Sequence, residues 1–149
     1  MQYREPMKKP FPRPQHPNLA VRRGLSGLGL FATGPIKRGA FVIEYWGTVV
    51  SEEEANRRGG KYLFELDHDK AIDGTTRKNT ARYVNHSCRA NCEPREVGDR
   101  VFIFATKDVR EGEELTYDYG KEYWNDHIAP GGCRCGHCRR AAGTKKRTA

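Results

Sequence analysis

Long hydrophobic runs are missing from this chain of 149 residues. No stretch approaches the roughly 20 apolar residues that a membrane-spanning helix needs. The N-terminal sequence MQYREPMKKP also lacks the apolar core of a secretory signal peptide. These two absences predict a soluble, intracellular protein that makes no membrane contact. A long internal repeat is absent as well, which argues against a solenoid.

Cysteines are few, and the five that occur stand in two tight clusters, at positions 88 and 92 and at positions 133, 135 and 138. An odd number of cysteines without an export signal fits metal ligation better than a disulfide framework. Zinc is the metal expected, and reduced surface thiols are the alternative. The three thiols of the second cluster need a fourth ligand to close a tetrahedral zinc site. The candidates for that ligand are Cys88, Cys92 and His137.

Apolar residues make up 36% of the sequence and charged residues 31%, so the chain is more polar than an average globular domain without the depletion that marks general disorder. Its length suits one domain with a single core. The net charge is +8, and part of the excess lies near the two ends. Basic ends favour an acidic or nucleic-acid-associated partner, although a solubilising tail explains them equally well.

Prolines are concentrated at the start of the chain, where residues 1–18 hold five of the eight. This density opposes regular structure and predicts an extended basic arm. From Leu19 onward, short apolar runs alternate with glycine and proline turns, which favours many short strands over helices. The strands expected are 19–22, 29–32, 41–45, 62–66, 71–73, 101–106 and 115–117.

One helix is signalled clearly. Ser51 and Glu54 have the spacing of a capping box. Gly59 and Gly60 then end the helix after about two turns. The fold class is therefore mainly β, a β-rich α+β arrangement.

Two glycine-containing motifs lie in the first third of the chain. In SGLGLFA, Gly27 and Gly29 flank Leu28, so the backbone can approach a ligand without interference from a Cβ atom. An ordinary tight turn is the simpler interpretation, and the third glycine of a dinucleotide-binding fingerprint is absent. The second motif, FVIEYWG at residues 41–47, ends an apolar strand in aromatic residues, which belong more often to a core than to a site.

Two further motifs carry most of the candidate chemistry. ELTYDYGKEYW, residues 114–124, places Tyr117 and Tyr119 at strand spacing and therefore on one face. Phenol rings on one face can line a slot for a cation, because ring faces attract ammonium groups and hydroxyls hydrogen-bond them. Half-buried tyrosines of a strand are the alternative. RYVNHSCRANC, residues 82–92, packs an amide, an imidazole and two thiols together.

These segments, in this order, resemble a SET-domain lysine methyltransferase, over about residues 19–140. The short insert between the second and third motifs likens the chain to the minimal SET proteins of bacteria and viruses. The motifs that carry the resemblance are GxG at 27–29, YxG at 45–47, NHSC at 85–88, ELTYDY at 114–119 and a post-SET tail, CRCGHC, at 133–138.

The resemblance implies a SET-domain fold of small sheets with a C-terminal pseudoknot, in which the NHSC and DY segments lie side by side. It also implies a division of the chain into four parts. These are an arm at 1–18, a SET domain at 19–124, a post-SET zinc-binding segment at 125–142 and a basic tail at 143–149.

The activity implied is transfer of a methyl group from S-adenosylmethionine to a lysine side chain in a protein. Tyr119 would orient the amine and the methyl group, and Tyr45 would be a second phenol of the lysine channel. Tyr117 occupies the phenylalanine-or-tyrosine position that sets channel width, and tyrosine there implies mainly monomethylation. The implied donor-binding residues are Gly27, Leu28, Gly29, Arg82, Asn85, His86 and Tyr119.

The zinc ligands implied are Cys88, Cys133, Cys135 and Cys138. Only two residues separate Cys135 from Cys138, fewer than in the usual post-SET pattern, so Cys92 stays a second candidate for a zinc ligand.

The substrate expected is a histone tail or another basic protein, so the chain would be cytoplasmic, or chromatin-associated in a host nucleus. One alternative is a catalytically silent SET-fold module that binds peptides. Another is a small zinc protein that binds nucleic acid through its basic tails, for which no base-reading motif is present.

Overall fold

The computed structural model describes residues 14–24, 27–60, 62–67 and 69–120. Within this part of the chain the structure is rich in strands, which form three small sheets, with one short α-helix and one 3-10 helix. The prediction of a β-rich fold of small sheets is confirmed. The predicted arm is described only from residue 14 onward, and the post-SET segment and basic tail lie outside the described residues.

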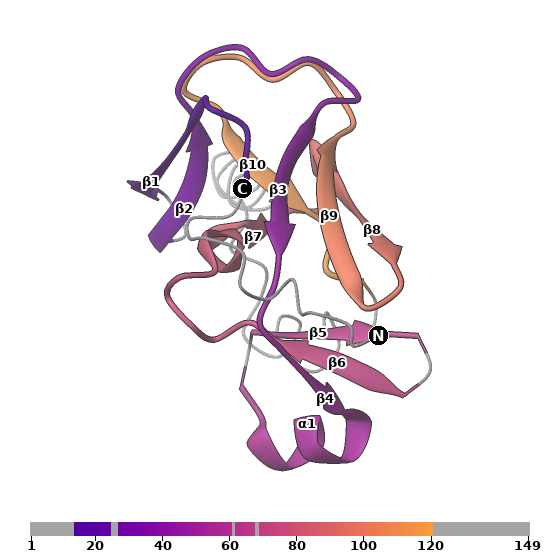
Figure 1. Ribbon diagram of the computed structural model, residues 1–149. Helices are drawn as coiled ribbons and strands as arrows, with labels where there is room; N and C mark the ends of the chain where they lie inside the picture. Colours follow the sequence, from indigo (N-terminus) through magenta and orange to yellow (C-terminus); the bar gives the residue numbers. More distant parts are fainter. Residues whose placement is uncertain (1–13, 25–26, 61, 68, 121–149) are drawn as a thin grey trace, which may run out of the picture.

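The first sheet joins segments from both ends of the described chain (Figure 1). Its strand order is β1-β2-β10-β7, and β10 pairs antiparallel with β2 but parallel with β7. The parallel register sets Thr116 beside Asn85 and Tyr117 beside His86. The strands are β1 (Leu19–Gly24), β2 (Gly27–Ala32), β7 (Asn85–His86) and β10 (Glu114–Tyr117).

The second sheet is an antiparallel arrangement of three strands in the order β3-β9-β8. Its strands are β3 (Phe41–Tyr45), β8 (Cys92–Val97) and β9 (Arg100–Ala105). The third sheet has the order β4-β6-β5, also antiparallel. Its strands are β4 (Thr48–Ser51), β5 (Leu63–Leu66) and β6 (Lys70–Asp73).

The helix α1 (Glu52–Arg58) follows β4 directly. The Ser51 side chain accepts a hydrogen bond from the Glu54 backbone N–H at 3.0 Å, and Gly59 forms the C-cap, so the predicted cap and stop are confirmed. In Figure 1, α1 and the third sheet form one lobe below the other two sheets. The 3-10 helix η2 (Thr80–Tyr83) leads into β7 and places Arg82 just before it.

The core lies between the first two sheets. Leu30, Val42, Val101, Ile103 and Leu115 are all fully buried and belong to one apolar cluster. They come from β2, β3, β9 and β10, so the strands that carry the GxG motif, Tyr45 and the ELTYDY motif also form the core. Burial of such side chains stabilises each by about 1.5–3 kcal/mol and fixes the motifs in place.

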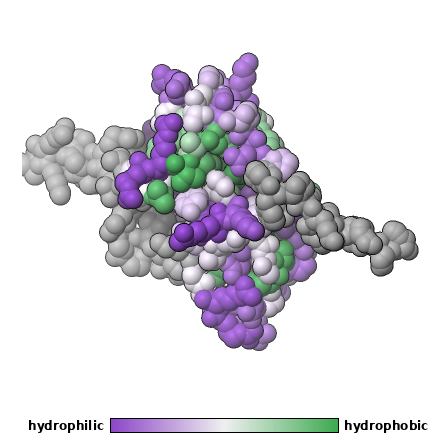
Figure 2. All heavy atoms as spheres, turned by 60° about the vertical axis from the view of Figure 1, so that its left-hand side comes forward, coloured by the Kyte–Doolittle hydropathy of each residue, from purple (hydrophilic) through white to green (hydrophobic). Residues whose placement is uncertain are grey.

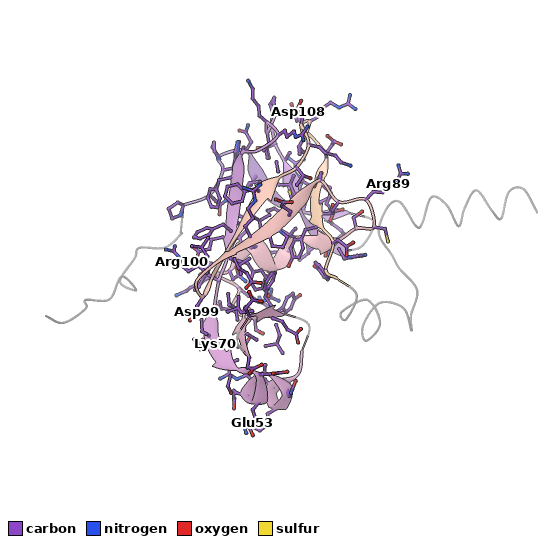
Figure 3. The ribbon with its side chains drawn as sticks, turned by 90° about the vertical axis from the view of Figure 1, so that its right-hand side faces the viewer. Glu53, Lys70, Arg89, Asp99, Arg100 and Asp108 are labelled. Atoms are coloured by element: carbon purple, nitrogen blue, oxygen red, sulfur yellow. The ribbon has the colours of Figure 1, made fainter. Side chains whose placement is uncertain are left out.

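An ion pair joins the second and third sheets at their outer ends. Lys70 in β6 lies 3.2 Å from the carboxylate of Asp99, in the turn between β8 and β9, and Figure 3 shows the two labels next to each other. Both side chains are about half exposed, so the pair contributes at most about 1 kcal/mol. Neighbouring Arg100 instead forms a two-pronged bond with the buried carboxylate of Glu44 in β3, with distances of 2.9 and 3.0 Å.

Candidate functional site

The motifs of the candidate site meet on the first sheet. The strand β10 lies between β2, which carries Gly27 to Gly29, and β7, which is formed by Asn85 and His86. Direct pairing with β10 on both sides brings segments from three separate parts of the sequence together. The expectation that the NHSC and DY segments lie side by side is thus confirmed.

The predicted catalytic tyrosines form a continuous aromatic cluster. The ring centroids of Tyr117 and Tyr119 are 4.9 Å apart, and the ring of His86 lies 5.4 Å from that of Tyr119. Phe64 in β5 connects Tyr117 to Tyr45, with centroid distances of 6.3 and 5.6 Å. Phe64 was missing from the predicted site, because only its place in an expected strand marked it in the sequence.

Two of the tyrosine hydroxyls in this cluster bond to backbone carbonyls. The Tyr119 hydroxyl donates to the carbonyl oxygen of Val84 at 2.5 Å, and the Tyr45 hydroxyl donates to that of Tyr62 at 2.6 Å. These bonds fix where the hydroxyls point. Tyr45 and Tyr117 are both nearly buried, with 4% and 6% exposed, so the cluster offers a ring-lined, largely dehydrated environment.

The His86 imidazole is held in one tautomer by its neighbours. Its Nδ1 accepts a hydrogen bond from the Tyr119 backbone N–H at 3.1 Å, which leaves the proton on Nε2, 3.6 Å from the Cys88 sulfur. Burial lowers the pKa of His86, and the Asp118 carboxylate only partly opposes this. His86 is therefore a neutral side chain that ties β7 to the residues after β10.

Arg82 has a buried donor without a partner in the part of the chain that the structure describes. Its guanidinium lies over the Tyr62 ring, 4.2 Å from the centroid, and near the Tyr83 ring at 5.3 Å, and it also donates to the Thr75 carbonyl oxygen. Its Nε is buried and has no acceptor among the described residues. An unpaired buried N–H costs about 1–3 kcal/mol. A bound ligand that supplies an acceptor would remove this cost, which fits the predicted role of Arg82 in donor binding.

Asn85 and the glycine motif contact each other directly. The Asn85 amide nitrogen donates to the Leu28 carbonyl oxygen at 2.9 Å and to Glu114 Oε2 at 2.8 Å. Leu28 itself is 46% exposed, and Figure 2 shows hydrophobic side chains gathered on the side of the molecule that carries β1 and β2. The predicted donor-binding residues Gly27, Leu28, Gly29, Asn85 and His86 thus lie on β2 and β7, the two strands that flank β10.

The two cysteines of the described chain differ in how far they are exposed to solvent. Cys88 is exposed, whereas Cys92 is 4% exposed in β8 and burial raises the pKa of its thiol to about 12. A ligand must be a thiolate, so Cys88 is the better suited of the two. No group of three potential metal ligands occurs within the described ranges. The other predicted zinc ligands, Cys133, Cys135 and Cys138, lie outside the described residues, as does His137.

No helix in the described part of the chain is long and apolar enough to cross a membrane.

Comparison with known proteins points to one family. Residues 27–120 match the family model described as SET domain. The chain is 38% identical over 135 residues to "Histone-lysine N-methyltransferase 2D" of Homo sapiens, which covers 80% of this chain and 2% of that protein. It is 39% identical over 122 residues to "Histone-lysine N-methyltransferase, H3 lysine-4 specific" of Schizosaccharomyces pombe, with 73% and 13% covered.

A plant protein gives a match of similar strength. The chain is 39% identical over 136 residues to "Histone-lysine N-methyltransferase ASHH1" of Arabidopsis thaliana, covering 81% of this chain and 27% of that protein. The chain therefore spans only a small part of the length of these relatives.

Proposed function

The chain belongs to the SET-domain family, and from that premise we propose that it transfers a methyl group from S-adenosylmethionine to the side-chain amine of a lysine in a protein. One observation carries the proposal. The parallel pairing of β7 with β10 sets Asn85 and His86 directly beside the strand that leads to Tyr119. Residues suited to hold the donor and residues suited to hold the lysine thus adjoin each other.

The aromatic cluster suits the lysine side chain. Ring faces attract an ammonium group, and Tyr45, Phe64, Tyr117 and Tyr119 supply four rings in sequence. A lysine ammonium has no lone pair, so it must lose a proton before it can accept a methyl group. A dehydrated environment lowers the pKa of lysine because it disfavours the charged form. A dedicated strong base is then unnecessary.

The donor, when bound, supplies a methyl group on a positively charged sulfur. Transfer requires the amine nitrogen, the methyl carbon and the sulfur in one line, and holding reactants in such a geometry accounts for much of the rate. The residues proposed to hold the donor are Gly27, Leu28, Gly29, Arg82, Asn85, His86 and Tyr119. Tyr119, whose hydroxyl is fixed toward the Val84 carbonyl, is proposed to orient the amine.

We propose mainly monomethylation as the outcome. Tyr117 is almost fully buried in the aromatic cluster, and its hydroxyl narrows the space around the amine relative to phenylalanine.

Zinc is proposed as a structural ion held by Cys88, Cys133, Cys135 and Cys138. The exposed sulfur of Cys88 supports its part in this set, while the burial of Cys92 argues against the alternative ligand.

The substrate proposed is a histone or another basic protein, with a chromatin-associated location. The names of the relatives support this, since all three act on histone lysine by their printed names. The likeness to minimal bacterial and viral proteins stays a prediction.

The test is transfer of a labelled methyl group from S-adenosylmethionine to core histones and to protein extracts. The wild type should label a protein band, and the Tyr119→Phe variant should label it at least about 100-fold more slowly, because the orienting hydroxyl is lost. Donor binding should persist in that variant. Equal labelling by both proteins would contradict the role of Tyr119. Peptide binding without any transfer would instead support the silent binding module.

A further inference from the structure

We infer that Glu114 is a positioning residue of the donor site, which acts by fixing the orientation of the Asn85 side-chain amide. The inference rests on the proposed function and adds a residue that the motif comparison left without a role. Glu114 is the first residue of β10 and lies one strand away from β7.

The contacts of Asn85 leave one orientation for its amide. The nitrogen Nδ2 donates one N–H to the Leu28 carbonyl at 2.9 Å and the other to Glu114 Oε2 at 2.8 Å. A carbonyl and a carboxylate are both acceptors, so the amide oxygen could not replace the nitrogen there without facing two acceptors. The oxygen Oδ1 therefore faces away from these groups, and no described residue donates a hydrogen bond to it.

Gly29 provides the space that this arrangement needs. A Cβ atom at position 29 would lie 2.4 Å from Glu114 Oε2 and 3.1 Å from Asn85 Nδ2. Glu114 pairs with Phe31 in the antiparallel register, so its side chain leaves the sheet on the same face as position 29. The second glycine of the GxG motif thus makes room for a carboxylate of the protein itself.

The carboxylate occupies this place at a cost. Partial burial raises the pKa of Glu114, and the hydrogen bond from Asn85 offsets only part of that effect. Groups held against a local cost of this kind are expected at functional or strained sites. The amide oxygen of Asn85, which no described residue bonds, would accept a hydrogen bond from an N–H group of the methyl donor. Without Glu114 the Asn85 amide can rotate by half a turn. It would then present its N–H groups where the N–H group of the donor needs an acceptor.

Two variants separate orientation from charge. Glu114→Leu removes the acceptor, whereas Glu114→Gln keeps an amide oxygen that can accept from Asn85. The matched control is Glu111→Leu. It removes an exposed carboxylate in the turn that leads into β10. Thermal unfolding of each protein first establishes that it is folded.

The first measurement needs no ligand. The side-chain amide signals of Asn85, identified by their absence from Asn85→Asp, are recorded by NMR. In Glu114→Leu one of the two proton signals should move upfield and exchange faster with water, because it loses its acceptor. Both signals should stay close to their wild-type positions in Glu114→Gln and in Glu111→Leu.

The second measurement is calorimetric binding of S-adenosylhomocysteine, the demethylated form of the donor. Glu114→Leu should bind it about tenfold more weakly, the change expected for loss of one hydrogen bond to a charged group. Glu114→Gln should bind within about twofold of the wild type, as should Glu111→Leu. Three results would each overturn the inference. The first is a Glu114→Leu variant that binds S-adenosylhomocysteine as tightly as the wild type, and the second is a Glu114→Leu spectrum with unchanged Asn85 signals. The third is an equal loss of affinity in Glu114→Leu and Glu114→Gln.

The two proposals fail in different ways. A wild type that binds S-adenosylhomocysteine but transfers no methyl group contradicts the proposed function and leaves the role of Glu114 supported by both measurements. Normal transfer by a Glu114→Leu variant with wild-type affinity contradicts the role of Glu114 alone. Failure of the wild type to bind the compound contradicts both.

Discussion

The hydroxyl of Tyr45 donates a hydrogen bond to the carbonyl oxygen of Tyr62 at 2.6 Å, across a separation of 17 residues. The backbone N–H of Gly74 donates to the same oxygen at 2.7 Å. The Tyr62 ring in turn lies over the guanidinium of Arg82. Tyr62 therefore contacts Tyr45 of the proposed lysine channel through its carbonyl, and Arg82 of the proposed donor site through its ring.

Replacing Tyr45 with phenylalanine tests the first of these contacts. The Tyr62 carbonyl would keep its bond from Gly74, so the variant should fold and lose about 1 kcal/mol in the free energy of unfolding. Urea unfolding measures this change. Tyr62→Phe is the matched control, since it removes a hydroxyl while the carbonyl and the ring over Arg82 remain. Equal stability losses in the two variants would contradict the importance of the Tyr45 bond.

Replacing Tyr117 with phenylalanine should raise the number of methyl groups transferred. Removal of the buried hydroxyl enlarges the space beside Tyr119, so a lysine that already carries a methyl group can enter again. Mass spectrometry of a methylated histone peptide should show mainly monomethyl-lysine with the wild type and a majority of dimethyl- or trimethyl-lysine with the variant. A product distribution that stays monomethylated would count against the role given to Tyr117.

The zinc proposal distinguishes Cys88 from Cys92. The wild type should contain about one zinc ion per chain, and Cys88→Ser should contain far less, because a structural site needs all four ligands. Cys92→Ala should keep its zinc and lose about 1–2 kcal/mol of stability through the cavity it leaves in the core. Elemental analysis and urea unfolding measure the two quantities. The reverse pattern, zinc lost only from the Cys92 variant, would make Cys92 the ligand.

The glycine before β4 should be hard to replace. A Cβ atom at Gly47 would lie 2.0 Å from the backbone oxygen of Asp73, in a strand of the third sheet that cannot simply rotate away. Gly47→Ala should therefore lose about 1–3 kcal/mol of stability or more. Gly34→Ala is the control, because its Cβ would meet only the side chain of Asn18, at 2.9 Å. Equal unfolding midpoints for the two variants would contradict this prediction.

The raised pKa of Glu114 predicts a pH dependence of stability. Burial holds the pKa of the folded state above the ordinary value of 4.5. Between these two values the folded protein binds more protons than the unfolded protein, so the contribution of Glu114 to stability falls as the pH rises. Glu114→Gln lacks this titration. The stability of the glutamine variant relative to the wild type should thus increase as the pH rises from about 4.5 toward neutrality.

Urea unfolding of both proteins at several pH values measures this difference. A difference that stays constant, or that decreases toward neutral pH, would contradict the direction of the shift.

Local patterns in the sequence predicted much of the fold. The apolar run of Phe41–Tyr45 coincides with β3, and the Ser51 cap begins α1 where the capping box indicated. The strand Cys92–Val97 was missed, because its proline and its charged residues disguise an edge strand. The two-residue strand β7 was missed as well, since parallel pairing with β10 stabilises it and no local pattern marks such a pairing.

The candidate site also combines residues that the sequence marks with residues that only the assembled sheets reveal. Tyr45, Tyr117 and Tyr119 were recognisable from the family motifs, and the structure brings them into one cluster. Phe64 lies outside those motifs, and Glu114, although it opens the ELTYDY motif, had no role assigned from the sequence. Their roles depend on neighbours from distant strands, and strand register is visible only once the sheets are assembled.

The pairing of β7 with β10 also bears on how the protein folds. Asn85 contacts a carbonyl 57 residues earlier in the chain, and His86 contacts a backbone N–H 33 residues later. Contacts of such long range slow folding, because chain closure must precede any gain from pairing. Asn85 and His86 can therefore make both of these contacts only after the chain has been synthesised as far as Tyr119.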